Sequence, residues 1–202
     1  MPYKPTEREY RNLGSFDAQG AEQNSAELIV RGTPIVFDTP TVICEFDGVE
    51  YKECIASGAL DGCDMSDFIF NRNHGSNDST VYARSKNNSL VYRVTQSGLE
   101  IEAHLDGEDE RHRALYRDIS KRRVDKMSFS FVVKEDSYDR DTHTRTIRKI
   151  KKLYDVSAVD FPAYNDTSIT TARDFFSAEH EKEFKELEYL RRRQMLIAKT
   201  LL

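Results

Sequence analysis

The sequence predicts an α+β fold, and three features of its patterning support that class. Residues 90–94 and 99–105 alternate apolar and polar side chains, as half-buried strands do. Residues 107–123 change to the period of a helix with one apolar face. From residue 177 onward charged helix-forming side chains dominate, which predicts a charged helical tail.

Further strands are predicted from β-branched and aromatic runs that are bounded by turn residues. They cover residues 28–37, 42–46, 49–55, 68–71, 127–135, 145–150 and 152–159. Asp47-Gly48 predicts a hairpin turn, because this pair readily adopts the positive φ angles of a tight turn. Asp106 or Asp109 is the expected cap of the helix, whose last turn carries the basic run 121–123.

The chain divides into three expected parts. Residues 1–26 are polar and irregular, which predicts a flexible N-terminal segment. Residues 27–176 hold the predicted strands and form the expected domain. Residues 177–202 form the charged helical tail, in which the apolar side chains make an interrupted stripe.

Composition argues against several classes of protein. The 202 residues are 38% hydrophobic and 32% charged with a mean hydropathy of -0.67, which is polar but sufficient for a core. A net charge of -5 disfavours a nucleic-acid binder, and the apolar runs are too short to span a membrane. No apolar signal segment is found, and three cysteines without a CxxC pair suggest reduced thiols in a cytosolic setting. Without a zinc, calcium or phosphate-binding motif, neither a metal nor a cofactor is expected.

Serine, histidine and aspartate in three separate stretches supply the groups that acyl transfer needs. A serine hydroxyl needs a base to take its proton, and the base needs a partner to fix its tautomer. Ser128 and Ser130 share one face of the strand 127–133, away from the large apolar side chains. Periodicity does not choose between them, and both also suit the plainer role of small polar residues bonded to the backbone.

The histidine and the acid are chosen by position. His74 follows a predicted strand and precedes a turn-rich stretch, which suits a cleft, and His104 in a later strand is its competitor. Asp155 shares a predicted strand face with Leu153, where a carboxylate is costly to bury unless it is paired. Its partner is expected to be the histidine or one of many basic residues. Asp160 faces the other way and is the weaker candidate.

Two further sets of residues enter as auxiliary candidates. Arg122 and Arg123 precede the serine strand, and we expect them to support an oxyanion together with backbone amides. Cys63 is a rival nucleophile, although a lone cysteine in a loop is more often structural.

Six short motifs occur in order over roughly residues 28–173. They are Gly32-Thr33-Pro34-Ile35-Val36-Phe37, Gly58-Ala59-Leu60, Asn73-His74, Gly98-Leu99-Glu100-Ile101-Glu102-Ala103, Met127-Ser128-Phe129-Ser130-Phe131 and Asp155-Val156-Ser157-Ala158-Val159-Asp160-Phe161-Pro162-Ala163. Together they resemble the prohead serine proteases of tailed phages. Each motif is only moderately specific, so the resemblance depends on their number and order.

The resemblance implies a fold similar to the herpesvirus assemblin proteases, a mixed, mainly antiparallel β-barrel with surrounding helices. It implies that Ser128 is the nucleophile, His74 the general base and Asp155 the orienting acid. Ser130 stands where the family usually has glycine, so Ser130 stays an alternative. Assemblins use a second histidine as the third member, which keeps His104 as an alternative orienting residue.

The resemblance also implies a serine endopeptidase of capsid maturation that acts inside the assembling procapsid in the host cytoplasm. Its expected substrates are the phage scaffolding protein or the scaffolding segment of the major capsid protein, and the protease itself through autoprocessing. A homo-oligomer is compatible with this role, whereas nucleic acid and membranes are not expected partners. The rival from another class is a non-enzymatic scaffold or capsid assembly protein on the same fold.

Overall fold

The computed structural model describes residues 8–17, 27–76, 80–160 and 170–200, and it confirms the α+β class. The strands are β1 (Arg8–Asp17), β2 (Glu27–Val36), β3 (Thr41–Phe46), β4 (Val49–Ile55), β5 (Ile69–Arg72), β6 (Ala83–Arg84), β7 (Leu90–Val94), β8 (Gly98–Asp106), β9 (Lys126–Asp139) and β10 (Thr144–Val159). The helices are α1 (Glu110–Ser120) and α2 (Thr170–Thr200), with the short 3-10 turns η1 (Asn73–Gly75) and η2 (Ser85–Asn87).

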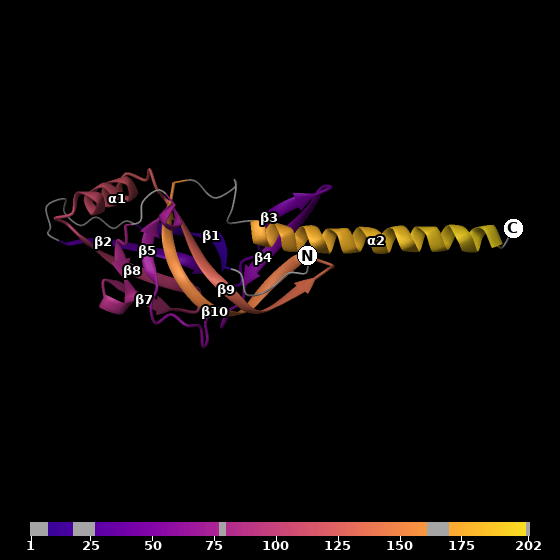
Figure 1. Cartoon of the computed structure of the whole chain (residues 1–202), viewed down its shortest axis with the longest axis horizontal. Coiled ribbons are helices and arrows are strands. Elements are labelled where there is room, and N and C mark those ends of the chain that lie inside the picture. The colour runs from indigo at the N-terminus through magenta and orange to yellow at the C-terminus, as the bar shows by residue number, and fades with distance from the viewer. Residues whose placement is uncertain (1–7, 18–26, 77–79, 161–169, 201–202) are drawn as a thin grey trace.

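The strands form one mixed sheet. Neighbours follow the order β3-β4-β10-β9-β1-β2-β8-β7, and β5 pairs with both β10 and β6. The pairs β10–β4 and β10–β5 are parallel, and the other pairs are antiparallel. Figure 1 shows a curved sheet with α1 at one end and α2 running out from the other. Within the described ranges the path ends at β3 and β7 instead of closing, so the predicted barrel is not confirmed.

Local sequence signals explain where several elements begin and turn. Asp47 and Gly48 have φ angles of 50° and 80° and join β3 to β4 in the predicted hairpin. The Asp109 carboxylate accepts a hydrogen bond from the Arg111 amide at 2.8 Å and so caps α1. The buried face of α1 is formed by His112, Leu115, Tyr116 and Ile119. These local predictions are confirmed.

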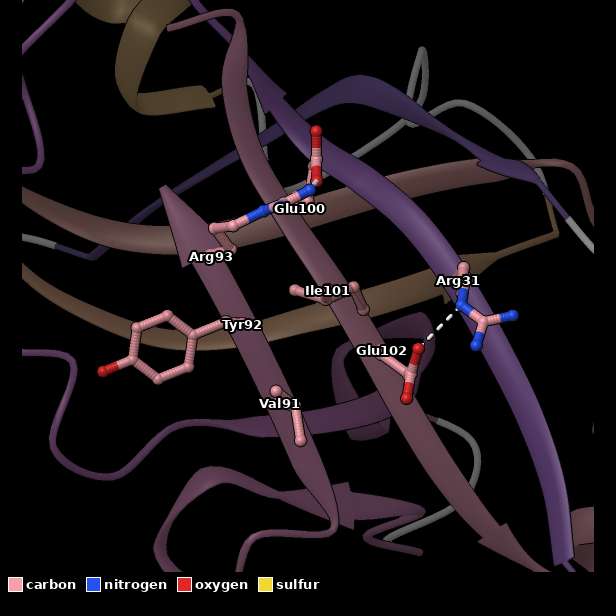
Figure 2. Close-up of a pocket in the computed structure, with 7 residues that line it drawn as sticks. All are labelled: Arg31, Val91, Tyr92, Arg93, Glu100, Ile101 and Glu102. Carbon is pink, nitrogen blue, oxygen red and sulfur yellow. Dashed lines mark hydrogen bonds and ion pairs between the residues drawn. The ribbon is translucent and has the colours of Figure 1, made fainter. Parts of the chain in front are cut away.

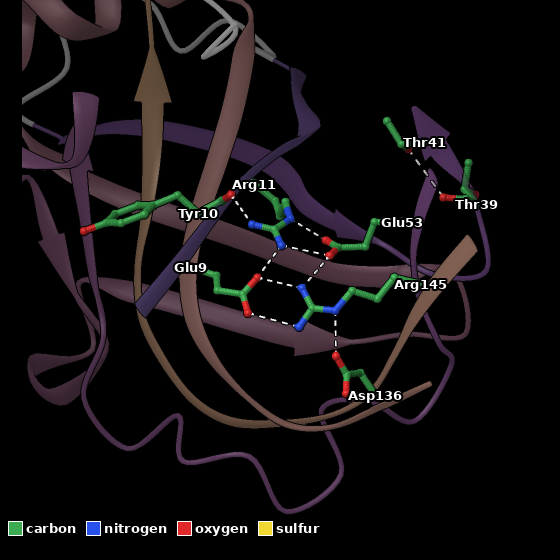
Figure 3. Close-up of polar contacts among 8 residues, drawn as sticks. All are labelled: Glu9, Tyr10, Arg11, Thr39, Thr41, Glu53, Asp136 and Arg145. Carbon is green, nitrogen blue, oxygen red and sulfur yellow. Dashed lines mark hydrogen bonds and ion pairs between the residues drawn. The ribbon is translucent and has the colours of Figure 1, made fainter. Parts of the chain in front are cut away.

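The prediction of a flexible segment over residues 1–26 is wrong for the part that forms β1. β1 lies between β9 and β2 and pairs with both. Its buried side chains include Glu9 and Arg11, which meet Glu53 and Arg145 in a cluster of four charges (Figure 3). Because these charges pair with one another inside the fold, Glu9 and Arg11 are buried although both are charged. The rest of the predicted flexible segment lies outside the described residues.

β10 is one strand of 16 residues where two strands were predicted, over 145–150 and 152–159. Its pairing with β9 shifts register at several points, the last between Leu153 and Asp155. Such a bulge places Tyr154 outside the register and changes the face that the next residue occupies. Leu153 enters the hydrophobic core, whereas Asp155 faces the other side of the sheet, so the prediction of a shared face is wrong.

α2 begins at Thr170, before the predicted start of the tail at residue 177. Ala172 and Phe176 are buried against Tyr51 of β4, so the first part of α2 belongs to the body of the protein. The distal part, which stands away from the sheet in Figure 1, exposes Phe184, Leu187, Tyr189, Leu190, Met195, Leu196 and Ile197. Neither of the two α-helices described is both long and apolar enough to cross a membrane.

Candidate active site

Ser128 and Asp155 lie on neighbouring strands and on the same side of the sheet. In the pairing of β9 with β10, Ser128 lies opposite Ser157, and Ser130 lies opposite Asp155. The apolar residues that alternate with the serines on β9 enter the hydrophobic core. The period-two pattern of this strand therefore directs both serine hydroxyls to the face that carries the acid.

β5 delivers His74 to the same place, because it pairs in parallel with the end of β10. Asn73 and His74 have φ angles of 48° and 54°, a left-handed conformation that Asn and His adopt more readily than most residues. Asn73 Nδ2 donates to Asp160 Oδ2 at 2.8 Å, and the Asp160 amide donates to Asn73 Oδ1 at 3.1 Å. The turn is thereby fixed to the end of β10, which orients the imidazole.

The three predicted catalytic side chains form one hydrogen-bonded chain. His74 Nε2 lies 2.6 Å from Ser128 Oγ, and His74 Nδ1 lies 2.6 Å from Asp155 Oδ1. An ionised carboxylate only accepts hydrogen bonds, so Nδ1 carries the proton and Nε2 accepts from the serine hydroxyl. Ser128 and Asp155 are fully buried, and 14% of the His74 side chain is exposed. The imidazole is therefore placed to remove the serine proton while the carboxylate holds it.

The second carboxylate oxygen of Asp155 is also paired. The Ser130 hydroxyl donates to Oδ2, and the Arg8 guanidinium contacts the same oxygen. Burial alone would raise the pKa of Asp155, but the hydrogen bond from His74, the one from Ser130 and the charge on Arg8 hold that pKa below its ordinary value. Asp155 is thus ionised at neutral pH. Because Ser130 contacts the carboxylate and Ser128 contacts the imidazole, the geometry favours Ser128 as the nucleophile.

Besides Arg8, three residues that the sequence analysis did not assign contribute to the site. Ser157 Oγ accepts from the His74 backbone amide at 3.2 Å and lies 2.9 Å from Asp155 Oδ1. Asn71 accepts a hydrogen bond from the Ser157 hydroxyl, and the Tyr10 ring meets the imidazole edge-on at 4.7 Å between ring centres. Ser157 lies two residues after Asp155 on the same strand, and this spacing was a sequence signal that the two side chains share a face. Nothing in the sequence places Tyr10 beside the histidine.

His104 and Arg123 have partners outside the hydrogen-bonded chain of Ser128. His104 lies on β8, separated from β9 by β1 and β2, and its Nε2 lies 3.0 Å from Glu102 Oε1. The structure therefore does not bring His104 to the serine. Arg123 pairs with Asp118 at 3.2 Å, and the oxyanion role of Arg122 and Arg123 stays a prediction.

Thiol and metal chemistry find no support in the described parts of the chain. Burial raises the pKa of the Cys63 thiol to about 11, which disfavours the thiolate that a cysteine nucleophile needs. Among the residues with described positions, no group of three or more His, Cys, Asp or Glu is placed to hold a metal ion. The motif Phe161-Pro162-Ala163 lies outside those residues.

A groove of about 310 Å³ lies over β2, β8 and β7. Figure 2 shows the residues that line it, which are Arg31, Val91, Tyr92, Arg93, Glu100, Ile101 and Glu102. Arg31 and Glu102 form an ion pair of 2.7 Å across it. None of the lining residues belongs to the hydrogen-bonded chain of Ser128, so the groove is not part of the candidate active site.

A serine, an imidazole and a buried carboxylate joined in this order form the arrangement that serine hydrolases use for acyl transfer. The family model of the caudovirus prohead serine proteases matches residues 15–183, which is most of the chain. The protein therefore belongs to the caudovirus prohead serine protease family, as its motifs predict. No curated protein and no solved structure matches the chain.

Proposed function

We propose that the protein is a serine endopeptidase of phage capsid maturation. The observation that carries the proposal is the chain from Ser128 through His74 to Asp155, in which both hydrogen bonds measure 2.6 Å. Membership of a family of prohead serine proteases supports the same activity. The low pKa of Asp155 supports it too, because an ionised carboxylate stabilises the imidazolium that forms during acyl transfer.

In the proposed reaction Ser128 Oγ attacks the scissile carbonyl carbon while His74 Nε2 takes the hydroxyl proton. The imidazolium then gives this proton to the leaving amine, and the carbon–nitrogen bond breaks to leave an ester on Ser128. Water that loses a proton to the same imidazole hydrolyses the ester and restores the serine. Backbone amides beside Ser128, with Arg122 or Arg123, are the proposed donors to the oxyanion.

The proposed substrates are the scaffolding protein or the scaffolding segment of the major capsid protein, cleaved within the assembling procapsid in the host cytoplasm. Autoprocessing of the protease's own tail is part of the proposal. The distal part of α2 supports autoprocessing, because it stands away from the sheet and its apolar side chains are exposed. The same apolar side chains suit the binding of scaffold or of a second copy of the chain.

Incubation of the purified protein with phage scaffolding protein, followed by mass spectrometry of the fragments, tests this function. We expect the wild-type protein to cleave and a folded Ser128→Ala variant to leave the scaffold intact. Cys63→Ala serves as the matched control and keeps the wild-type fragment pattern. Cleavage that persists in Ser128→Ala but disappears in Ser130→Ala would show that the nucleophile is Ser130.

A different outcome separates the enzyme from the assembly protein. If the folded wild-type protein binds scaffold or capsid protein and produces no fragments within assembling capsids, the non-enzymatic role is correct. Binding then depends on the exposed apolar side chains of distal α2 and is unaffected by Ser128→Ala.

A further inference from the structure

Arg8 reaches the candidate active site from outside the stretch of residues 15–183 that matches the family. Its side chain is 40% exposed, yet its position is defined by two aromatic rings. The guanidinium carbon lies 4.7 Å from the centre of the Tyr154 ring and 5.3 Å from the centre of the Tyr10 ring. Cation–π contacts of this kind hold a side chain that solvent would otherwise leave free. Tyr154 is the residue that the bulge of β10 places outside the register.

The guanidinium of Arg8 joins two groups of the site. Its Nε and Nη2 atoms donate to Ser130 Oγ at 3.0 Å and 2.7 Å, and Nη2 also contacts Asp155 Oδ2. The Ser130 hydroxyl donates to the same carboxylate oxygen. Arg8, Ser130 and Asp155 therefore form a closed triangle of polar contacts on the side of the carboxylate away from His74.

A fully buried carboxylate needs donors on both oxygens. His74 Nδ1 serves Oδ1 of Asp155, and Arg8 with Ser130 serves Oδ2. Without the second set, one oxygen stays unpaired and the carboxylate is free to rotate toward another donor. The direction of the hydrogen bond to the imidazole then varies, and so does the alignment of Nε2 with Ser128.

We propose that Arg8 and Ser130 are positioning residues, and that β1 thereby completes the active site from outside the family-matched stretch. This inference rests on the proposed protease function, because it assigns the two residues a role in that reaction. Neither residue touches the nucleophile or the scissile bond in this account. Both act through Asp155.

The same contacts have an opposite interpretation. Arg8 and Tyr10 at the start of β1 lie beside the catalytic groups, where they could act as an inhibitory cover. The two interpretations differ in the sign of the effect. Loss of a positioning residue slows the reaction, whereas loss of an inhibitory contact speeds it.

The test measures kcat and KM for cleavage of scaffolding protein by Arg8→Ala and by Ser130→Ala. We expect kcat to fall on the order of 10-fold to 100-fold in each variant with KM unchanged. The double variant should lose little more than either single variant, because both residues hold one oxygen of Asp155. Guanidinium ion, added far below denaturing concentrations, should restore part of the rate of Arg8→Ala, whereas ammonium ion should not.

Arg31→Ala is the matched control. Arg31 lies on the neighbouring strand β2, its side chain is 46% exposed, and it pairs with Glu102 at 2.7 Å. Its loss removes a similar ion pair from the sheet without touching the candidate site, so the kinetic constants should stay at their wild-type values. If Arg8→Ala does not fold, Arg8→Lys takes its place, because lysine keeps the positive charge but lacks the planar set of guanidinium donors. Its kcat should lie between the wild-type value and the value expected for Arg8→Ala.

A second measurement does not need cleavage. In the Ser128→Ala background, the proton on His74 Nδ1 should give a resolved low-field NMR signal, and addition of Arg8→Ala should broaden it through exchange with water. If Arg8→Ala leaves the signal unchanged, the inference is wrong even if the protease is active. If the protein cleaves nothing but Arg8→Ala still broadens the signal, only the proposed function is wrong. Faster cleavage by Arg8→Ala also overturns the inference. So does a variant whose melting temperature falls while its kcat stays at the wild-type value.

Discussion

At the scale of single residues, the candidate site depends on Asp155. Its carboxylate is fully buried, and donors from three strands or turns surround it. Burial opposes ionisation, so the charge persists only because His74, Ser130 and Arg8 stabilise it. The site thus places one negative charge where it can orient an imidazole and stabilise its protonated form.

The depressed pKa of Asp155 makes a prediction about stability and pH. A carboxyl group whose pKa is lower in the folded state than its ordinary value of 3.8 stabilises the fold above that value and loses this effect as the pH falls through the folded pKa. From about pH 6 to about pH 3, the free energy of unfolding should therefore fall more in the wild-type protein than in Asp155→Asn. Urea unfolding at both values measures this difference.

Asp141→Asn is the control for that measurement, because Asp141 lies exposed in the turn between β9 and β10. Its dependence of stability on pH should match that of the wild-type protein. If the free energy of unfolding falls equally with pH in the wild-type protein and in Asp155→Asn, the fold does not stabilise the ionised Asp155 carboxylate.

The strand β1 shows how charge governs the structure at the scale of an element. Arg145 Nη1 lies 3.0 Å from Glu9 and 3.1 Å from Glu53, and its Nε lies 2.6 Å from Asp136. Arg11 contacts the same two glutamates. The four charges join β1 to β4 and β10 and balance one another only while all four are present, and Asp136 connects Arg145 to β9 (Figure 3).

Arg145→Leu should lower the free energy of unfolding by about 3–5 kcal/mol, because it leaves two buried glutamates with one arginine. Chemical denaturation measures the loss. Arg148→Leu is the control on the same strand, since Arg148 is exposed and donates to Ser137 Oγ at 2.9 Å. It should change stability by less than about 0.5 kcal/mol. Similar losses in the two variants would mean that the buried cluster does not hold β1 in place.

Elements with a clear period were predictable from the sequence, and elements held by distant polar contacts were not. The helix around Leu115 and the alternating strand around Ser128 follow from spacing alone. β1 was missed because the hydropathy of Glu9 and Arg11 predicts exposed side chains. Their partners Glu53 and Arg145 are distant in the sequence, and only the fold brings them close. The contact of Arg8 with Asp155 spans 147 positions along the chain and leaves no local signal.

The bulge in β10 limited the prediction in another way. Strict alternation assigns Asp155 to the face of Leu153, and one extra residue reverses that assignment. Residue type, order and family motifs nevertheless selected the three side chains that the fold brings into one hydrogen-bonded chain. The supporting residue Ser157 was visible on the strand face, but its role needed the backbone of His74.

At the scale of the whole molecule, the described residues form a curved sheet with α1 at one end and α2, which only partly packs on the sheet, at the other (Figure 1). Phe176 is fully buried beside Tyr51, and the large apolar side chains from Phe184 to Ile197 are exposed. The first part of α2 therefore stabilises the domain, and the distal part does not.

Deletion of residues 187–202 should change the free energy of unfolding by less than about 0.5 kcal/mol, because the side chains described in this stretch, at 187–197, are exposed. Phe176→Ala should lower it by about 3–5 kcal/mol, because it leaves a cavity between α2 and β4. Thermal and denaturant unfolding of the two proteins measures both effects. A large loss from the deletion would show that the distal helix is part of the folded body.

The most direct test of the central claim compares the rates of scaffold cleavage by Ser128→Ala, His74→Ala and the double variant. Residues that act as one unit are not additive, so the account predicts nearly the same low residual rate for all three proteins. Circular dichroism confirms that each variant is folded. Losses that multiply in the double variant, or a His74→Ala protein that cleaves at the wild-type rate, would contradict a serine activated by this histidine.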